Sequence, residues 1–260
     1  MLKLGNILSG LIVVTSMFLV CIPSNAQSSK SFGEIYIPDK SSISIFNKHT
    51  FHDGGNGIYP GTIATERENN KGYINFIAGS SWLGASDMQH IDGYARVYHN
   101  EPFTFPIGAN SKYRPVAISG AARTSAAYYD NNPGFINEKG IQKTELKIHK
   151  ISELEYWDIE GDVKTQITLT WDQRSGVETL TENELNRLTI VGWSGNQWEV
   201  IPSSIDRFVL DYGSSSGRKS TLLADFSKGS ISTNDLIRPN EFVYFTLGTI
   251  HPNLMGKVQL

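Results

Sequence analysis

Cysteine is almost missing from this sequence of 260 residues, and its one cysteine, Cys21, lies close to the N-terminus. A disulfide needs two cysteines, so none can form within the chain. An excess of charge of one sign is also missing, because the formal net charge is only -3 and charged residues make up 19% of the chain. This balance argues against electrostatic capture of nucleic acid. Stability must come from burial, from sheet hydrogen bonds or from a bound ion.

The sequence also lacks the familiar motifs of catalysis. It contains no Gly-x-Ser-x-Gly elbow, no His-Glu-x-x-His pair, no phosphate-binding loop and no dinucleotide fingerprint. A glycosidase-like pair of carboxylates stays open, because 26 residues are Asp or Glu and their separation in space cannot be read from the sequence. We therefore predict that the protein is not an enzyme and has no catalytic, cofactor-binding or metal-binding residues.

Long hydrophobic runs are absent except at the start, where residues 7–22 are largely apolar and follow the positively charged Lys3. Ser24 and Ala26 place small residues at the two positions that signal peptidase reads, so residues 1–26 are predicted to be a signal peptide. Cleavage after Ala26 predicts an exported protein of the periplasm, the cell surface or the extracellular space. No later segment approaches the roughly 20 apolar residues that span a bilayer, so no membrane span is expected after signal removal.

Two alternatives for this segment stay open. An uncleaved membrane anchor would need a longer run, and Pro23 lies where a spanning helix would continue. A lipid-modified Cys21 would need a lipoprotein signal, but such signals have a small residue where this chain has Val20. Signal cleavage is the interpretation that the sequence favours.

Turn-forming and aromatic residues are what the sequence does have, with 24 Gly, 11 Tyr, 12 Phe and 5 Trp. This profile favours strands over helices. Residues 165–171 alternate polar and apolar side chains, which predicts a half-buried strand with Ile167, Leu169 and Trp171 in the core. Further strands are expected at residues 114–119, 124–129, 155–159 and 241–247, the last buried on both faces, and these put Trp157 and Phe245 in the core.

A tight hairpin is expected around Gly195 and Asn196, which lie between two strand-like runs. We expect both residues to have positive φ, as hairpin turns often require. The turn would bring Trp193 close to Trp198 across the strand pair.

One short helix is expected at residues 182–187. Thr181 and Glu184 have the spacing of a capping box, in which the two side chains bond to the backbone at the start of a helix. This helix would be a connector.

Residues 27–98 differ from the rest of the chain. Short strand-like runs at 33–37, 42–46 and 72–77 are separated by turns rich in Gly and Asn, such as residues 52–57. Strands this short must stack on neighbours to bury their side chains. They are either the rungs of a small solenoid, which we favour, or the first sheet of the following sandwich.

Together these patterns predict an all-β protein, an antiparallel β-sandwich preceded by a short-stranded and solenoid-like β segment. The expected organisation is a signal peptide at 1–26, the short-stranded segment at 27–98, the β-sandwich module at 99–250 and a C-terminal tail at 251–260.

Candidate metal ligands are sparse. His49, His52 and Asp53 come nearest to a cluster, followed by His90 and Asp92. Residues three apart on a strand point to opposite faces, so His49 and His52 could share a metal only across a bend. We interpret these histidines as turn or surface residues.

Three acidic residues alternate along the chain at Asp158, Glu160 and Asp162, on either side of Gly161. Oxygen ligands at every second position before a turn can hold calcium, although the full loop pattern is missing. The alternative, which we favour, is a solvated acidic hairpin without any cofactor.

Aromatic residues suggest a rival function. Tyr128, Tyr129, Trp193 and Trp198 could form a stacking face for sugar rings. Sandwich cores and cross-strand pairs use the same residue types, so a structural role is the alternative that we favour. The exposure of these rings decides between the two.

Arg114 is expected to have a structural role. It lies between Tyr113 and Pro115, and it could stack on an aromatic ring or pair with a carboxylate such as Asp92.

A series of short motifs follows in order: DGYARVY at 92–98, FTFPIG at 103–108, KYRPV at 112–116, EYWDI at 155–159, a Trp-containing run at 188–198 and FTLG at 245–248. They resemble the DGYVR, FTFPVG, YRP, EYW, WNG..W and FTLG motifs of a β-rich module in large secreted and cell-surface proteins of Bacteroidota. The resemblance spans about residues 92–249.

The resemblance implies an exported β-rich module, of a kind often found in proteins that use type IX secretion and stay on the cell surface. Only residues 251–260 follow the strand that contains the FTLG motif, where such proteins commonly carry a sorting module, so retention at the surface stays open. The expected function is a non-catalytic structural or adhesion role in the cell envelope. The alternative is a carbohydrate-binding module, and less favoured is a glycosidase-like enzyme. The expected partner is a surface glycan or another envelope protein.

Overall fold

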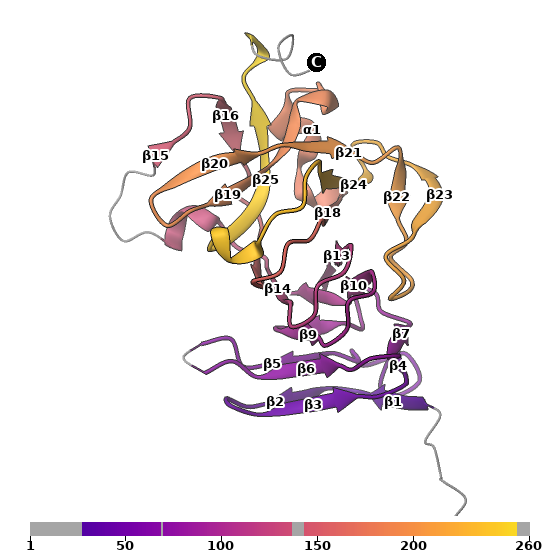
Figure 1. The fold of residues 1–260 in the computed structure, drawn as a ribbon. Helices are drawn as coiled ribbons and strands as arrows, with labels where there is room; N and C mark the ends of the chain where they lie inside the picture. The colour runs from indigo at the N-terminus through magenta and orange to yellow at the C-terminus, as the bar shows by residue number, and fades with distance from the viewer. Residues whose placement is uncertain (1–27, 69, 137–142, 254–260) are drawn as a thin grey trace, which may run out of the picture.

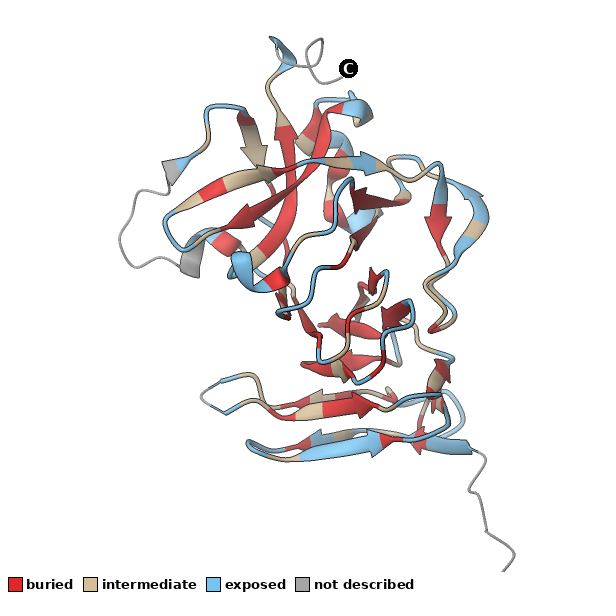
Figure 2. Ribbon diagram, viewed as in Figure 1, coloured by how far each residue is buried: buried red, intermediate tan, exposed pale blue. Residues whose placement is uncertain are grey.

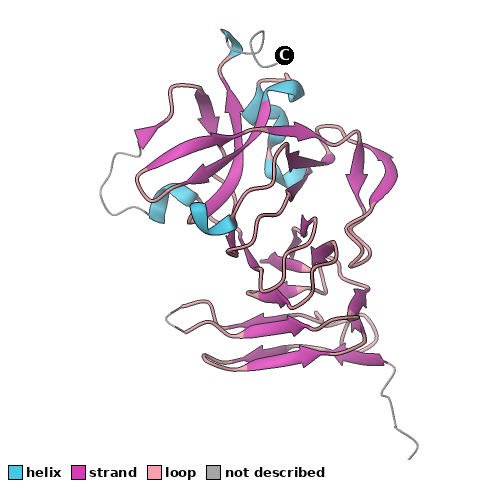
Figure 3. Cartoon of the chain, viewed as in Figure 1, coloured by secondary structure: helices cyan, strands magenta, loops and turns pink. Residues whose placement is uncertain are grey.

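A computed structural model describes residues 28–68, 70–136 and 143–253 of the chain. The predicted signal peptide lies outside the described residues, as does most of the predicted tail. Strands dominate the described chain, and its helices are short (Figure 3). The predicted all-β class is confirmed. No helix in the described ranges has the length and apolar character needed to cross a bilayer.

The chain begins as a three-sided parallel β-solenoid. Its first rung is β1 (Ser28–Phe32), β2 (Ile35–Ile37) and β3 (Ser42–Ile45), its second is β4 (Lys48–His52), β5 (Ile63–Thr65) and β6 (Tyr73–Phe76), and its third is β7 (Ser81–Leu83), β8 (Ile91–Asp92) and β9 (Ala95–Val97). Each strand pairs in parallel with the equivalent strand of the next rung. Of the two alternatives for this segment, the solenoid is the one observed.

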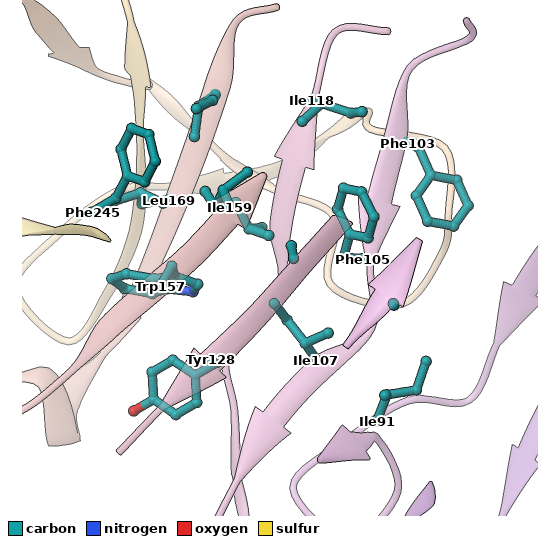
Figure 4. Close-up of a cluster of buried hydrophobic side chains, with 14 of the residues drawn as sticks. Ile91, Phe103, Phe105, Ile107, Ile118, Tyr128, Trp157, Ile159, Leu169 and Phe245 are labelled. Atoms are coloured by element: carbon teal, nitrogen blue, oxygen red, sulfur yellow. The ribbon is translucent and has the colours of Figure 1, made fainter. Parts of the chain in front are cut away.

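In-register parallel pairing stacks identical positions on top of one another. Ile35 pairs with Ile63, Ile63 with Ile91, and Ile91 with Ile107 of the strand above, so four isoleucines form one column inside the solenoid. The loops between the rungs have different lengths, which explains why the sequence has no fixed repeat. The column continues upward into the core of the sandwich (Figure 4).

Most of the other described strands form two mainly antiparallel sheets. The first contains β10 (Phe103–Phe105), β13 (Val116–Ile118), β18 (Ile167–Asp172), β24 (Lys228–Thr233) and β21 (Ser203–Ile205). The second contains β14 (Ser125–Tyr129), β17 (Tyr156–Glu160), β25 (Tyr244–Ile250), β19 (Leu188–Trp193) and β20 (Gln197–Ile201). Trp157, Leu169 and Phe245 belong to one core cluster drawn from both sheets, as predicted (Figure 4).

The remaining elements are short. They are β11 (Ile107–Ala109), β12 (Lys112–Tyr113), β15 (Lys143–Thr144), β16 (Ile148–Ile151), β22 (Phe208–Leu210), β23 (Lys219–Leu223), α1 (Val177–Thr181) and 3-10 turns at Pro133–Ile136, Gln173–Ser175, Leu185–Arg187 and Pro239–Glu241. β22 and β23 form a separate hairpin beside the sandwich (Figure 1).

Solenoid and sandwich share one continuous sheet. β9, the last strand of the solenoid, pairs antiparallel with β14 of the sandwich, with Arg96 opposite Ser125. On the next side of the solenoid, β8 pairs in parallel with β11. The expected boundary between residues 98 and 99 falls between β9 and β10, and sheet hydrogen bonding crosses it.

The prediction for β18 is half right. Ile167, Leu169 and Trp171 are fully buried as expected, but Thr168 and Thr170 on the opposite face are buried too. Buried residues are frequent along the strands of the sandwich (Figure 2). The opposite face is covered by polar contacts: Thr168 shares a 2.7 Å hydroxyl contact with Ser232, and the Thr170 hydroxyl donates to a backbone carbonyl. The strand is therefore buried on both faces.

The predicted hairpin is present, with a different turn. Trp193 pairs with Trp198, and their ring centroids are 5.6 Å apart. Only Gly195 has positive φ, at 91°, whereas positive φ was expected for Asn196 as well. A glycine at the first central position is typical of a type II′ turn, which needs one positive φ.

The predicted helix at residues 182–187 is wrong. Helix α1 ends at Thr181, and the next two residues, Glu182 and Asn183, have φ of 56° and 65°. The Thr181 hydroxyl donates to the carbonyl of Val177 at 2.8 Å, so Thr181 closes the last turn of α1 and caps no following helix. Only a 3-10 turn forms, at Leu185–Arg187.

Candidate functional site

A row of tyrosines crosses the outer face of the shared sheet where the solenoid meets the sandwich. We call it the tyrosine face, and it consists of Tyr73, Tyr94, Tyr129, Tyr156 and Tyr244, of which Tyr94 and Tyr156 are buried and the other three are partly exposed. Strand register creates it, because Tyr129 lies directly opposite Tyr156 on the neighbouring strand. Their rings stack with centroids 4.6 Å apart, and Tyr156 meets Tyr244 edge-on at 5.0 Å.

Cations lie over three of these rings. The Arg67 guanidinium lies 4.4 Å from the ring centroid of Tyr129, and the Lys71 ammonium lies 4.0 Å from that of Tyr94. Arg96 of β9 covers Tyr73 at 3.5 Å. Such cation and ring pairs are favourable contacts that strengthen when shielded from water. Rings and cations on this face therefore hold one another in fixed positions.

Two of the acidic residues flagged in the sequence also belong to this face. The Lys71 ammonium lies 3.1 Å from a carboxylate oxygen of Asp158 and 2.7 Å from one of Glu160. The Tyr94 hydroxyl donates to Asp158 and contacts the Tyr129 hydroxyl at 3.0 Å. Burial raises the pKa of Asp158 and outweighs the opposing effect of Lys71. Burial, followed by the charge of Asp158, also raises the pKa of Tyr94.

The suggested calcium ligands do not converge on one point. Lys71 binds Asp158 and Glu160, while Asp162 accepts a 2.7 Å hydrogen bond from the amide of Asn240. Across residues 28–253, apart from the segments left undescribed, no three acidic, histidine or cysteine side chains lie close enough to hold a metal together. The three acidic residues therefore form ion pairs with a lysine or a hydrogen bond with an asparagine amide.

A cleft of about 750 Å³ adjoins the tyrosine face, and we call it the junction cleft. Its lining includes Arg96, Tyr98, Arg123, Glu160, Asp162 and Asn240. Arg123 has φ of 66°, which is uncommon for a residue with a side chain. Its backbone N–H donates to Val97 at 2.7 Å, which holds this conformation in place. The cleft thus presents guanidinium, carboxylate and amide groups beside an exposed tyrosine ring.

The histidines flagged in the sequence lie apart. His49 of β4 is buried beside β1. Its ring nitrogens lie 2.8 Å and 3.2 Å from the hydroxyls of Ser29 and Ser31. His52 instead stacks on Phe32 at 4.9 Å. The interpretation of His49 as a turn or surface residue is wrong, because strand pairing places it inside the solenoid. His90 is also buried, and its Nδ1 lies 3.1 Å from a backbone carbonyl.

Arg114 has the predicted structural role, with other partners than Asp92. Its guanidinium lies 2.9 Å from Glu155 and also binds Asp172. Asp92 pairs with Arg67 at 2.5 Å. Glu155 comes from the segment before β17 and is far from Arg114 in sequence, so no local signal could reveal the pair.

The aromatic residues proposed as a sugar platform are divided between core and surface. Tyr128, Trp193 and Trp198 are buried, with exposures of 0%, 8% and 1%. Tyr129 is partly exposed and belongs to the tyrosine face. Sequence reasoning missed Tyr73, Tyr94, Tyr156 and Tyr244 as members of one face. Their alternation within strands was visible, but the order of the strands in the sheet was not.

Comparison with known proteins matches this chain to no family model, no curated protein and no solved structure.

Proposed function

We propose that the protein is an exported, non-catalytic β module with an adhesion or structural role in the cell envelope. The observation that carries this proposal is the tyrosine face, in which Arg67, Lys71 and Arg96 lie over tyrosine rings. Aromatic residues and arginine are enriched at protein interfaces and dominate their binding energy. Because these side chains already hold one another, binding would cost little additional ordering.

The adhesion role is tested with a pair of variants on the same scaffold. Arg96→Ala with Tyr73→Ala removes one cation and ring pair of the tyrosine face, while Arg207→Ala with Phe208→Ala removes a similar pair on the distant β22–β23 hairpin. We expect the first double variant to lower the attachment of whole cells, or of purified protein, to a surface at least tenfold. The second should attach like wild type. Equal attachment of all three proteins would reject the tyrosine face as the contact surface.

Export is tested separately on protein from the native host. Mass spectrometry should find Gln27 at the N-terminus, and protease added to intact cells should degrade the protein if it reaches the surface. An N-terminus at Met1, or a lipid on Cys21, would contradict signal cleavage after Ala26.

Carbohydrate binding is the second candidate, and the junction cleft favours it. Sugar hydroxyls both donate and accept hydrogen bonds, and the cleft offers donors on Arg96 and Arg123 with acceptors on Asp162. The ring of Tyr98, 38% exposed, could stack on a sugar face. A glycan array followed by calorimetry should then find a ligand whose affinity falls at least tenfold in Arg123→Ala. Arg218→Ala, which changes an exposed arginine elsewhere, is the control.

Catalysis would overturn both versions of the proposal. Asp158 and Glu160 are the acids to examine, because they lie together on the tyrosine face. Release of reducing sugar from a polysaccharide panel, abolished by Asp158→Asn or by Glu160→Gln, would identify a glycosidase.

A further inference from the structure

The first rung leaves one end of the solenoid open. Strands β1, β2 and β3 are each the last strand of their sheet within the described chain. They lie at the end of the solenoid far from the sandwich (Figure 1). The outer edge of each strand therefore presents backbone N–H and C=O groups to which no described strand is paired. Such edges are templates for pairing with another chain.

The apolar interior is also open at this end. Ile43 points into the solenoid beside Ile74, yet it is 43% exposed while Ile74 is 1% exposed. The cause is that no described strand lies below it. Phe32, Tyr36 and Phe46 add exposed rings around the same rung, at 63%, 61% and 66%. Large exposed apolar groups that share one rung favour an interaction surface at this end.

Edge protection is weak within the three strands of this rung. Natural edge strands carry charges or prolines that discourage pairing. Lys30 is the one charged residue within β1, β2 and β3, and residues 41–47, which include β3, contain neither a charged residue nor a proline. Segments of this length with strand-forming residues and no charge pair readily with other strands.

We propose that the first rung binds the first rung of a second copy of this chain, which gives a two-fold symmetric dimer. A three-sided rung is matched in cross-section by another rung of the same kind, and a second copy always provides one. Turning that copy over reverses its strands, so all facing pairs become antiparallel. The same patch then serves both subunits, as two-fold dimers require.

Charge selects the arrangement of the strands. If β1 faced β1, the two Lys30 side chains would lie opposite each other and repel. We therefore place β3 opposite β3 and β1 opposite β2. Inward residues must oppose inward residues, and among the registers that satisfy this rule we choose the one that sets Lys30 opposite Tyr36 of the second copy. The hydroxyl of Tyr36 donates to Glu66 at 2.7 Å, so the ammonium would meet a ring and a carboxylate.

For β3 the same rule allows Ile43 opposite Ile43 or Ile43 opposite Ile45 of the second copy, and we choose the second register. It also brings Ser44 opposite Ser44 of the second copy, on the outer side of the rung. Both isoleucines point into the solenoid, so the apolar column would continue across the two-fold axis without interruption. The exposed surface of Ile43 would be covered.

Sedimentation velocity over a dilution series tests the dimer. The sample is the protein that cells have exported with its own N-terminal segment. Wild type should sediment as a dimer that dissociates on dilution. Ser44→Lys should raise the dimer dissociation constant at least tenfold, because like charges then lie opposite each other. Lys30→Glu should weaken the dimer as well, since it faces Glu66, while Lys30→Arg should not. Thr179→Lys, at an exposed position of α1, should leave the dimer unchanged.

Hydrogen exchange provides a second measurement and controls for folding. Amides of β1 and β3 should exchange more slowly in wild type than in Ser44→Lys at equal concentration, while those of β22 and β23 should not differ. A wild type that is monomeric at all concentrations overturns the proposal. So does a dimer that Ser44→Lys and Lys30→Glu both leave intact.

Discussion

Arg114 is a charge placed inside the protein. Its side chain and that of Glu155 are only 1% and 2% exposed. The Tyr128 hydroxyl donates to Glu155 at 2.8 Å, and the backbone carbonyl of Tyr113 accepts from Arg114 at 3.1 Å. Removing one partner of such a pair leaves a buried charge without compensation.

Arg114→Met should therefore lower the free energy of unfolding by about 3–5 kcal/mol. Urea unfolding measures the loss. The double variant with Glu155→Gln should recover much of it, because both charges are then gone. Arg174→Met, at an arginine on the surface, should cost no more than about 1 kcal/mol. A similar loss in both single variants would show that burial of Arg114 is not what matters.

His49 makes the stability of the fold depend on pH. Burial, assisted by the nearby His52, lowers the pKa of His49 from 6.5 to about 4. The folded protein thus holds the neutral ring, while the unfolded chain takes up a proton below about pH 6.5. Stability is fully present above pH 6.5 and is lost as the pH falls from there toward 4.

The unfolding free energy should therefore fall by about 1–2 kcal/mol between pH 7 and pH 5 because of this one group. His49→Gln keeps an uncharged hydrogen-bonding side chain, so it should reduce that dependence. Urea unfolding at several pH values measures the slope. His251→Gln is the control, and a slope unchanged by His49→Gln would mean that other groups cause the loss.

At the scale of the element, the two faces of β18 pack in different ways. One face fills the core, with Leu169 fully buried. On the other face, Thr168 contacts Ser232 of the neighbouring strand β24, and Asp206, before β22, accepts from Ser230 at 2.6 Å and from Ser232 at 2.9 Å. The alternation of residues predicted the first face and gave no sign that the second is covered.

Truncations on the two faces of β18 should differ in size. Leu169→Ala should cost about 2–5 kcal/mol, because it leaves a cavity in the core. Thr168→Ala should cost about 1 kcal/mol, since it removes a buried hydroxyl contact with Ser232. Thr221→Ala, on exposed β23, should have little effect. Chemical denaturation measures all three, and equal losses for Leu169 and Thr168 would contradict the assigned faces.

At the scale of the whole molecule, solenoid and sandwich are joined in two ways. The β9–β14 pair continues one sheet from the solenoid into the sandwich, and one core cluster runs from Ile37 to Leu247. Separate folding of the two parts would break the sheet and expose this core.

Calorimetry should therefore give a single unfolding transition in which both parts melt together. The fluorescence of Trp82, in the solenoid, should change at the same temperature as that of the tryptophans of the sandwich. Ala126→Lys, at the β9–β14 junction, should destabilise the whole protein. Two separate transitions in wild type would instead support independent units on either side of residue 98.

The sequence by itself determined the strand class, the inward face of residues such as Leu169 and the hairpin at Gly195, because these depend on side-chain alternation and local backbone freedom. Only the tertiary structure decided that the early strands pair in parallel and that the outer face of β18 is covered. It also decided that Lys71 binds Asp158 and Glu160, which are 87 and 89 residues away along the chain. These contacts depend on which strands become neighbours, and strand order is fixed by burial of the whole chain rather than by any local pattern.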